Sequence, residues 1–149
     1  MIVAGEGAAI VRRTPQEILE FALDLDRYRQ VDPKFRTIHR REMTGDEGEI
    51  RYSGRLRGIP TPADTQSIRL IRWTRLDYES IPSPLNRLAR FHGWFECEER
   101  EEGTFVRHRE EFDFSPVVGW LAAPLFKRWL QRQVAEEVDD LKRMLEAEA

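Results

Sequence analysis

The chain is 149 residues long, carries a net charge of −3 at pH 7 and is 40% hydrophobic by residue count. This length predicts one domain, residues 1–149, with a sizeable core. Acidic and basic residues alternate along the chain, which argues against a nucleic-acid binder, since such a protein needs a basic face. The chain contains no run of 18 apolar residues, so we expect no membrane-spanning segment. With one cysteine and no signal-peptide pattern, we expect a cytoplasmic protein without disulfides.

The first part of the chain predicts a strand and two short helices. Residues Ile2–Arg12 are apolar and small, as in a strand. Thr14 and Glu17 flank Pro15-Gln16 and are typical of a helix start, because they can form a capping box. A second helical piece, Asp26–Val31, ends before Pro33, since the residue preceding a proline disfavours the helical conformation.

A run of antiparallel strands follows. Thr37–Thr44 and Glu49–Gly58 predict a hairpin around a four-residue turn that contains two glycines. Its expected cross-strand pairs are Met43 with Ile50 and Glu42 with Arg51. Asp64–Trp73 and Arg75–Ser80 form either two strands or one bulged strand, and their register stays open. The predicted loops are Ile59–Ala63 and Ile81–Ala89, each with two prolines, and the second could overhang a pocket mouth.

Residues Arg90–Phe114 predict a long hairpin that turns at Glu102-Gly103. We expect Arg100 to lie opposite Phe105, because this register puts two opposite-charge pairs on one face. These pairs are Glu98 with Arg107 and Glu96 with Arg109. The charged face would meet solvent and the other face the core. The predicted inner face comprises Phe91, Gly93, Phe95, Cys97, Val106, His108, Glu110, Phe112 and Phe114.

Residues Ser115–Ala147 predict one long amphipathic helix, capped by Ser115 and opened by Pro116. Pro124 predicts a kink, or a short helix before the main one. A two-stranded hairpin cannot bury so long a helix, so the other strands must complete the sheet. The predicted fold class is therefore α+β: a curved antiparallel β-sheet wrapped around a long C-terminal helix, with two short helices between strands 1 and 2.

Several segments resemble the START-related (SRPBCC) superfamily of polyketide cyclase/dehydrase-like and lipid-transport proteins. They are Thr14-Pro15-Gln16-Glu17-Ile18, Asp24-Leu25-Asp26-Arg27-Tyr28, Pro33, Gly93-Trp94-Phe95, Gly103-Thr104 and Pro116. The resemblance implies a helix-grip fold in which the sheet and the C-terminal helix enclose a hydrophobic cavity. It implies binding of a hydrophobic small molecule such as a lipid, sterol, quinone or polyketide-like compound. The alternatives are a polyketide cyclase or aromatase, and a protein-interaction factor of respiratory or ribosome-associated type.

Candidate catalytic residues follow from the predicted faces. His108 and Glu110 are two apart on one strand and share its inner face, where a histidine beside a carboxylate can act as a general acid or base. The alternative is a satisfied polar pair near the rim. Arg41 shares a face with His39 and Tyr52, and an arginine with a tyrosine hydroxyl could stabilise an enolate. The alternative there is a hydrophilic, solvent-exposed edge.

The remaining candidates concern ligand contact. The predicted ligand-binding residues are Tyr52, Phe95, Phe112 and Leu130, for which core packing is the alternative. Cys97 lies opposite His108 in the expected register and could form a nucleophilic pair with it, although a buried cysteine usually packs as a small hydrophobe. The histidines lack metal-ligand spacing, so we expect no metal and no other cofactor. Ligand identity, turnover and oligomeric state stay open.

Overall fold

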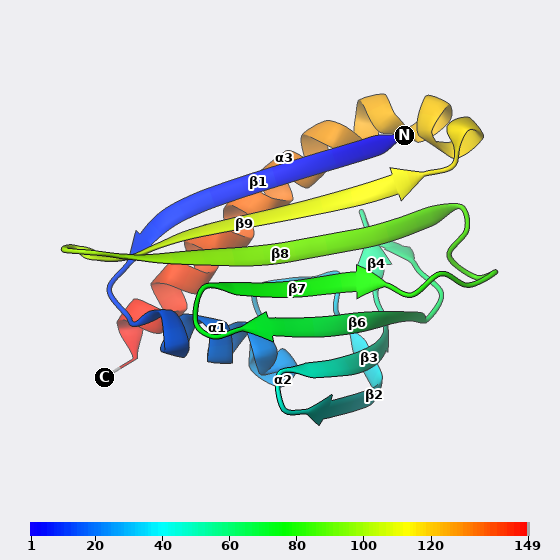
Figure 1. Ribbon diagram of the computed structural model, residues 1–149. Helices are drawn as coiled ribbons and strands as arrows, with labels where there is room; N and C mark the ends of the chain where they lie inside the picture. Colours follow the sequence, from blue (N-terminus) through cyan, green and yellow to red (C-terminus); the bar gives the residue numbers. More distant parts are fainter. Residues whose placement is uncertain (149) are drawn as a thin grey trace.

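The computed structural model describes residues 1–148, which form a seven-stranded antiparallel sheet, a small two-stranded ribbon and three helices (Figure 1). The strands are β1 (Ile2–Val11), β2 (Thr37–Thr44), β3 (Glu47–Ser53), β4 (Arg55–Leu56), β5 (Ile59–Pro60), β6 (Asp64–Ile71), β7 (Arg75–Ser80), β8 (Ala89–Arg100) and β9 (Gly103–Phe114). The helices are α1 (Pro15–Leu23), α2 (Leu25–Tyr28) and α3 (Pro116–Ala147). The sheet order is β1-β9-β8-β7-β6-β3-β2, and β4 pairs with β5. The predicted α+β class is confirmed.

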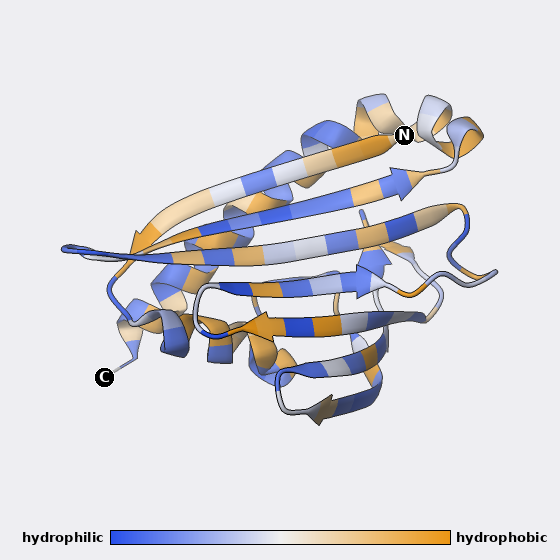
Figure 2. Ribbon diagram, in the orientation of Figure 1, coloured by the Kyte–Doolittle hydropathy of each residue, from blue (hydrophilic) through white to orange (hydrophobic). Residues whose placement is uncertain are grey.

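Helix α3 crosses one face of the sheet beneath β1 and β9, and α1 and α2 lie on the same side, near its C-terminal end (Figure 1). The backbones of β1 and α3 touch. A Cβ added at Gly5 would lie 2.8 Å from the carbonyl oxygen of Leu130. Glycine at this position therefore allows the helix to pack directly on the strand. The tip of the β8–β9 hairpin is hydrophilic, whereas the start of β1 is hydrophobic (Figure 2).

The predicted start of the first helix is confirmed in detail. The Thr14 hydroxyl accepts from the Glu17 N–H at 3.2 Å, and the Glu17 carboxylate accepts from the Thr14 N–H at 3.4 Å. This reciprocal capping box fixes the point at which the chain leaves β1. The second helix is shorter than predicted, since α2 ends at Tyr28.

Both predicted hairpin registers are wrong by two residues. The first was placed on a four-residue turn and the second on the turn Glu102-Gly103, but Thr44 pairs with Glu47 and Arg100 with Gly103, so the loops are Gly45-Asp46 and Glu101-Glu102. In the first hairpin, a two-residue loop matches the twist of the flanking strands. In the second, the two-residue loop lies one residue earlier than predicted, and the expected cross-strand charge pairs do not determine the register. The observed pairs include Met43 with Gly48, Arg41 with Ile50, Glu96 with Arg107, Trp94 with Arg109, Cys97 with Val106 and Phe95 with His108. A shift of two residues preserves the faces, so the inner face of β8–β9 is as predicted.

The structure also settles three further points of the prediction. The strand that begins at Glu47 ends at Ser53, and the following residues fold into the β4–β5 ribbon instead of a plain loop. Residues 64–80, for which one bulged strand was the alternative, form two paired strands, β6 and β7. Pro124 lies inside α3, which remains one helix from Pro116 to Ala147, so no separate short helix precedes it.

Candidate functional site

Five ionisable side chains lie together in the interior, between the sheet and α3. We call them the buried charge cluster. Its members are Asp32 and Lys34 from the loop between α2 and β2, His108 and Glu110 from β9, and Glu137 from α3. Lys34 is 5% exposed and each of the others 3% or less. Burying an ion costs several kcal/mol unless it is paired, so the partners of each charge determine the properties of the cluster.

The Lys34 ammonium is the central cation. Its Nζ lies 2.9 Å from Asp32 Oδ1 and 3.0 Å from Glu110 Oε2. It also donates hydrogen bonds to Glu137 Oε1 and, at 3.2 Å, to Gln133 Oε1. One ammonium thus joins a loop, a strand and a helix that are far apart in the sequence.

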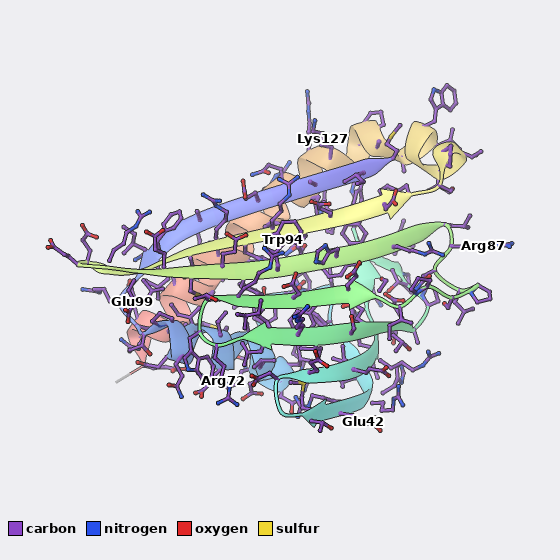
Figure 3. The ribbon with its side chains drawn as sticks, in the orientation of Figure 1. Glu42, Arg72, Arg87, Trp94, Glu99 and Lys127 are labelled. Carbon is purple, nitrogen blue, oxygen red and sulfur yellow. The ribbon has the colours of Figure 1, made fainter. Side chains whose placement is uncertain are left out.

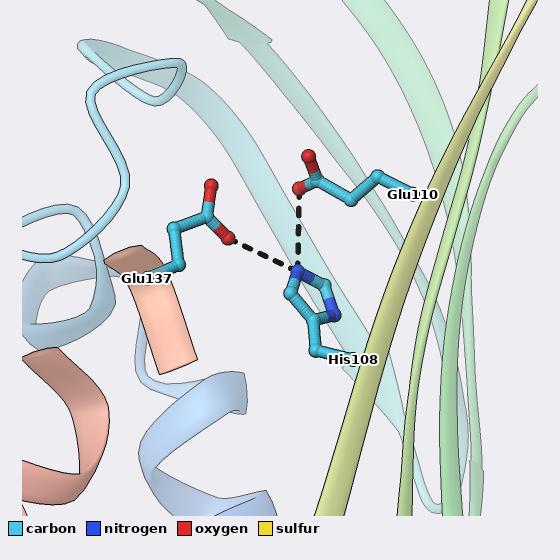
Figure 4. Close-up of side chains that lie close together, drawn as sticks. All are labelled: His108, Glu110 and Glu137. Atoms are coloured by element: carbon cyan, nitrogen blue, oxygen red, sulfur yellow. Dashed lines mark hydrogen bonds and ion pairs between the residues drawn. The ribbon is translucent and has the colours of Figure 1, made fainter. Parts of the chain in front are cut away.

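The His108 imidazole is held at both nitrogens, and Figure 4 shows the contacts of Nε2 with Glu110 and Glu137. Nε2 lies 3.0 Å from Glu137 Oε2 and 3.3 Å from Glu110 Oε1, and Nδ1 lies 2.9 Å from the carbonyl oxygen of Trp94. The ring stacks on Phe95 with centroids 3.9 Å apart. All three facing groups are acceptors, so the imidazole satisfies them from both nitrogens only when it is protonated.

These contacts determine the protonation of the cluster. Burial by itself lowers the pKa of His108, but hydrogen bonds to Glu110 and Glu137 raise it to about 10. Burial raises the pKa of Glu137, yet Lys34 and His108 together lower it to about 2. Burial and the nearby Glu137 raise the pKa of Asp32, which favours its neutral form. Two cations, Lys34 and His108, thus share the carboxyl groups of the cluster.

Local structure explains why Lys34 points inward. The Lys34 N–H donates to Asp32 Oδ1 at 2.9 Å, which fixes the turn after Pro33. The strand β3 ends where Gly54 passes over this turn, and a Cβ at Gly54 would lie 1.5 Å from the Lys34 carbonyl oxygen. Glycine at position 54 is therefore required for β3 to cover the lysine backbone.

A cavity of about 260 Å³ opens beside the cluster. Its walls come from the β4–β5 ribbon, the loop 81–89 and the inner face of the sheet. The lining includes Lys34, Tyr52, Leu56, Gln66, Leu85, Leu88, Phe91 and Phe112. A larger hollow of about 1030 Å³ lies at the other end, around Arg12, Arg13, Glu99 and Arg100, but it is open and bordered by charged surface residues. The smaller, mostly apolar cavity is therefore the better ligand site.

One residue of the cavity wall, Gln66, carries a buried acceptor without a partner in the described part of the chain. Gln66 donates from Nε2 to the Tyr52 hydroxyl at 2.8 Å and to Asp64 Oδ2 at 3.2 Å. Its Oε1 is buried and has no hydrogen-bond partner among the described residues. A buried polar atom without a partner is uncommon and calls for an explanation. A bound molecule that donates a hydrogen bond would supply one.

The predicted site residues fall into two groups. His108 and Glu110 are buried side by side, and Tyr52 and Phe112 line the cavity. Arg41 does not reach it: the side chain is 40% exposed and lies 3.9 Å from Asp26, because β2 is an edge strand.

Three other predicted contacts also lie outside the cavity. His39 is exposed and contacts Ser53, as expected for the hydrophilic alternative. Phe95 stacks on His108, and Leu130 packs beneath β1, so both belong to the core and not to the cavity lining. The apolar character of Phe95 and Leu130 predicted that they are buried. It could not predict how far the cavity extends along the sheet.

Sequence reasoning missed Asp32, Lys34, Gln66 and Glu137. Glu137 had a usable signal, because it lies three residues after Val134 and four before Leu141, within the apolar stripe of α3. Lys34 lies in a loop without periodicity, so no pattern of the sequence indicates where it points.

The nucleophilic pair suggested for Cys97 is not formed, since Cys97 pairs with Val106 across the hairpin. Burial raises the pKa of its thiol to about 12. We therefore expect the folded protein to react with a disulfide reagent such as DTNB at least about a hundredfold more slowly than the unfolded chain, because the thiolate is the reactive form. Fast labelling of the native protein would contradict this assignment.

His108, Glu110 and Glu137 also bring three possible metal-ligand atoms within 4.8 Å of one another. Histidine spacing alone did not reveal this set, because one member comes from α3. The Lys34 ammonium already contacts both carboxyl groups, so a metal ion would have to displace it. The absence of a metal stays a prediction.

A sheet folded over a long helix beside an apolar cavity defines a START-related helix-grip domain. Residues 5–146 match the protein family described as polyketide cyclase/dehydrase and lipid transport, and the chain belongs to this family. The resemblance seen in the sequence is confirmed. A comparison with curated proteins found no significant match.

Solved structures show the same fold. The protein TTHA0849 from Thermus thermophilus is 17% identical with a TM-score of 0.78, covering 98% of this chain and 99% of that one. A START superfamily protein from Mycobacterium smegmatis is 13% identical with a TM-score of 0.71, covering 96% and 99%. The Zhui aromatase/cyclase from a Streptomyces strain is 12% identical with a TM-score of 0.67, covering 99% and 98%. At these identities the similarity establishes the fold alone.

Proposed function

We propose that the protein binds a compact hydrophobic molecule with one polar group in the cavity beside Tyr52 and Phe112. The unpartnered Oε1 of Gln66 carries the proposal, because leaving a buried acceptor unsatisfied costs about 1–3 kcal/mol. A ligand hydroxyl would satisfy it while the ligand's apolar part contacts Phe91 and Phe112. Membership of a family that includes lipid-transport proteins agrees with this function.

The volume of the cavity narrows the ligand class. At about 260 Å³ it lies just below the range of roughly 300–1,000 Å³ that is usual for small-molecule sites. Among lipids, sterols, quinones and polyketide-like compounds, this size favours a single ring system or one end of a longer molecule. A whole sterol would leave part of its surface outside.

Two matched probes test the proposal, namely 2-naphthol and naphthalene, which differ by one hydroxyl. We expect 2-naphthol to bind about five- to tenfold more tightly in a fluorescence titration, because one hydrogen bond contributes about 1 kcal/mol. Gln66→Leu should remove that difference. Ala63→Phe, at the cavity wall, should abolish binding of both probes, whereas Ala8→Phe on the exposed side of β1 should not. Unchanged binding to the Ala63→Phe variant would refute the site.

A second candidate function is a cyclase- or aromatase-type enzyme. The observation that favours it is Lys34, which lines the cavity and whose ammonium belongs to the buried charge cluster. A cation at this position could polarise a ligand carbonyl and stabilise an enolate. His108 would act through Lys34 and not as a base at neutral pH, because its pKa of about 10 keeps it protonated. Exchange of the α-protons of 2-tetralone in D2O, followed by NMR, separates binding from catalysis: a pure binding protein would not accelerate it.

A further inference from the structure

The end of the molecule where the cavity lies exposes an unusual number of large apolar side chains. Val117, Trp120, Leu121 and Leu125 protrude from the first turns of α3. Ile59 protrudes from the β4–β5 ribbon, and Leu85 and Leu88 from the following loop. These seven side chains are 57–75% exposed. We call the three segments that carry them, residues 54–63, 81–90 and 115–128, the docking face.

The three segments are neighbours in space. The first two both border the cavity, since Arg55, Leu56, Leu85 and Leu88 all belong to its lining. The third is hydrogen-bonded to the second, because the Ser115 N–H donates to the Leu88 carbonyl oxygen at 3.0 Å. Figure 1 shows the start of α3 and the loop before β8 at the same end of the sheet, and Figure 3 places Arg87 at its extremity.

The docking face is basic although the chain as a whole is acidic. Its segments contain six of the 24 Lys and Arg residues and none of the 27 Asp and Glu residues. The six are Arg55, Arg57, Arg87, Arg90, Lys127 and Arg128, and all are exposed. Within residues 1–148 none of them forms an ion pair with a carboxylate, whereas most other basic side chains do. Folding therefore collects unpaired positive charge around the exposed apolar residues, which the alternating charges of the sequence did not reveal.

The acids of α3 lie too far along the helix to cancel this charge. The first exposed one, Glu136, is eight residues beyond Arg128, roughly 12 Å along the axis. That separation exceeds the Debye length of about 8 Å at physiological ionic strength. Asp113, closer in space, is held by the Met1 ammonium at 3.2 Å.

We propose that the docking face binds the surface of an anionic phospholipid bilayer. Protruding leucine, valine and tryptophan side chains would enter the interface between headgroups and acyl chains, and the six basic side chains would contact lipid phosphates. A nucleic acid fits less well, because most of the exposed apolar side chains are aliphatic and offer no stacking surface to bases. This inference rests on the proposed function, since a ligand could then pass between the bilayer and the cavity without crossing water.

Binding to vesicles tests the inference. We expect the full chain to co-sediment with vesicles of phosphatidylcholine and phosphatidylglycerol, and much less with phosphatidylcholine alone. Because each basic residue near an anionic surface contributes about fivefold in affinity, the double variant Lys127→Glu/Arg128→Glu should bind about 30-fold more weakly or worse. The matched control Arg12→Glu/Arg143→Glu changes the net charge equally at the far end of the molecule and should retain binding. Leu121→Ser/Leu125→Ser should also weaken binding.

Tryptophan fluorescence locates the contact. Brominated lipids should quench the fluorescence of the wild-type protein, and Trp120→Phe should remove most of that quenching while the protein still sediments with vesicles.

Absence of vesicle binding, or equal binding of the two charge-reversal variants, would overturn the inference. Dimerisation or DNA binding through the same residues, without vesicle binding, would overturn it as well. Binding of 2-naphthol is measured without lipid, so failure of the docking face and failure of the proposed ligand site are distinguishable.

Discussion

Replacing Lys34 by methionine is expected to lower the free energy of unfolding by about 3–5 kcal/mol, as measured by urea denaturation at neutral pH. The ammonium touches the carboxyl groups of Asp32, Glu110 and Glu137, all of which are buried. Methionine fills a similar volume but leaves these acids with one fewer cation. The loss is electrostatic, because removal of one partner leaves an uncompensated buried charge.

The controls for this prediction separate charge from packing. Lys127→Met, at an exposed position of α3, should change stability by less than about 0.5 kcal/mol. Adding Glu137→Gln to Lys34→Met should recover part of the loss, since it removes one of the charges left unpaired. A Lys34→Met variant within about 1 kcal/mol of the wild type would show that the cluster is not ionised as described.

The second large effect concerns pH and His108. In the folded protein its pKa is about 10, above the unfolded value of about 6.5, so the native state holds a proton that the unfolded chain releases. The stabilisation from His108 is complete below pH 6.5 and is lost as the pH rises towards 10. We expect the wild type to lose about 2–4 kcal/mol over this window relative to His108→Gln, which cannot titrate.

Urea denaturation at intervals between pH 6 and pH 10 measures this difference. His39→Gln is the matched control, because His39 is exposed and lies outside the cluster. It should show the same decline as the wild type. Parallel stability profiles for the wild type and His108→Gln would mean that the imidazole is neutral in the folded protein, with one of its nitrogens accepting a hydrogen bond.

Most of the fold could be predicted because its signals are local. The capping box at Thr14 and the apolar stripe of α3 fixed helix positions to within a few residues, and strand parity fixed the faces of β8 and β9. The strand registers of the two hairpins were harder to predict. A cross-strand charge pair contributes only about 0.2–1 kcal/mol, which is too little to fix the register of a hairpin by itself.

The site was only half predictable for a related reason. His108 and Glu110 were found because a strand with period two assigns each residue to a face. Their main partners, Lys34 and Glu137, come from a loop and a helix that meet the strand only in the folded chain. A charged residue within the apolar stripe of a helix, such as Glu137, is a pattern that can indicate a buried charge in related sequences.

The β8–β9 hairpin extends beyond its neighbours in the sheet. Pairing with β7 stops at Glu96 and pairing with β1 stops at Thr104, so the tip around Glu99 projects freely (Figure 3). A reporter dye could be attached at this tip through Glu101→Cys, because Cys97 is buried and would stay unlabelled. Such a dye would lie at the end opposite the docking face. It could therefore report how the molecule is oriented on a vesicle without disturbing the surface that binds it.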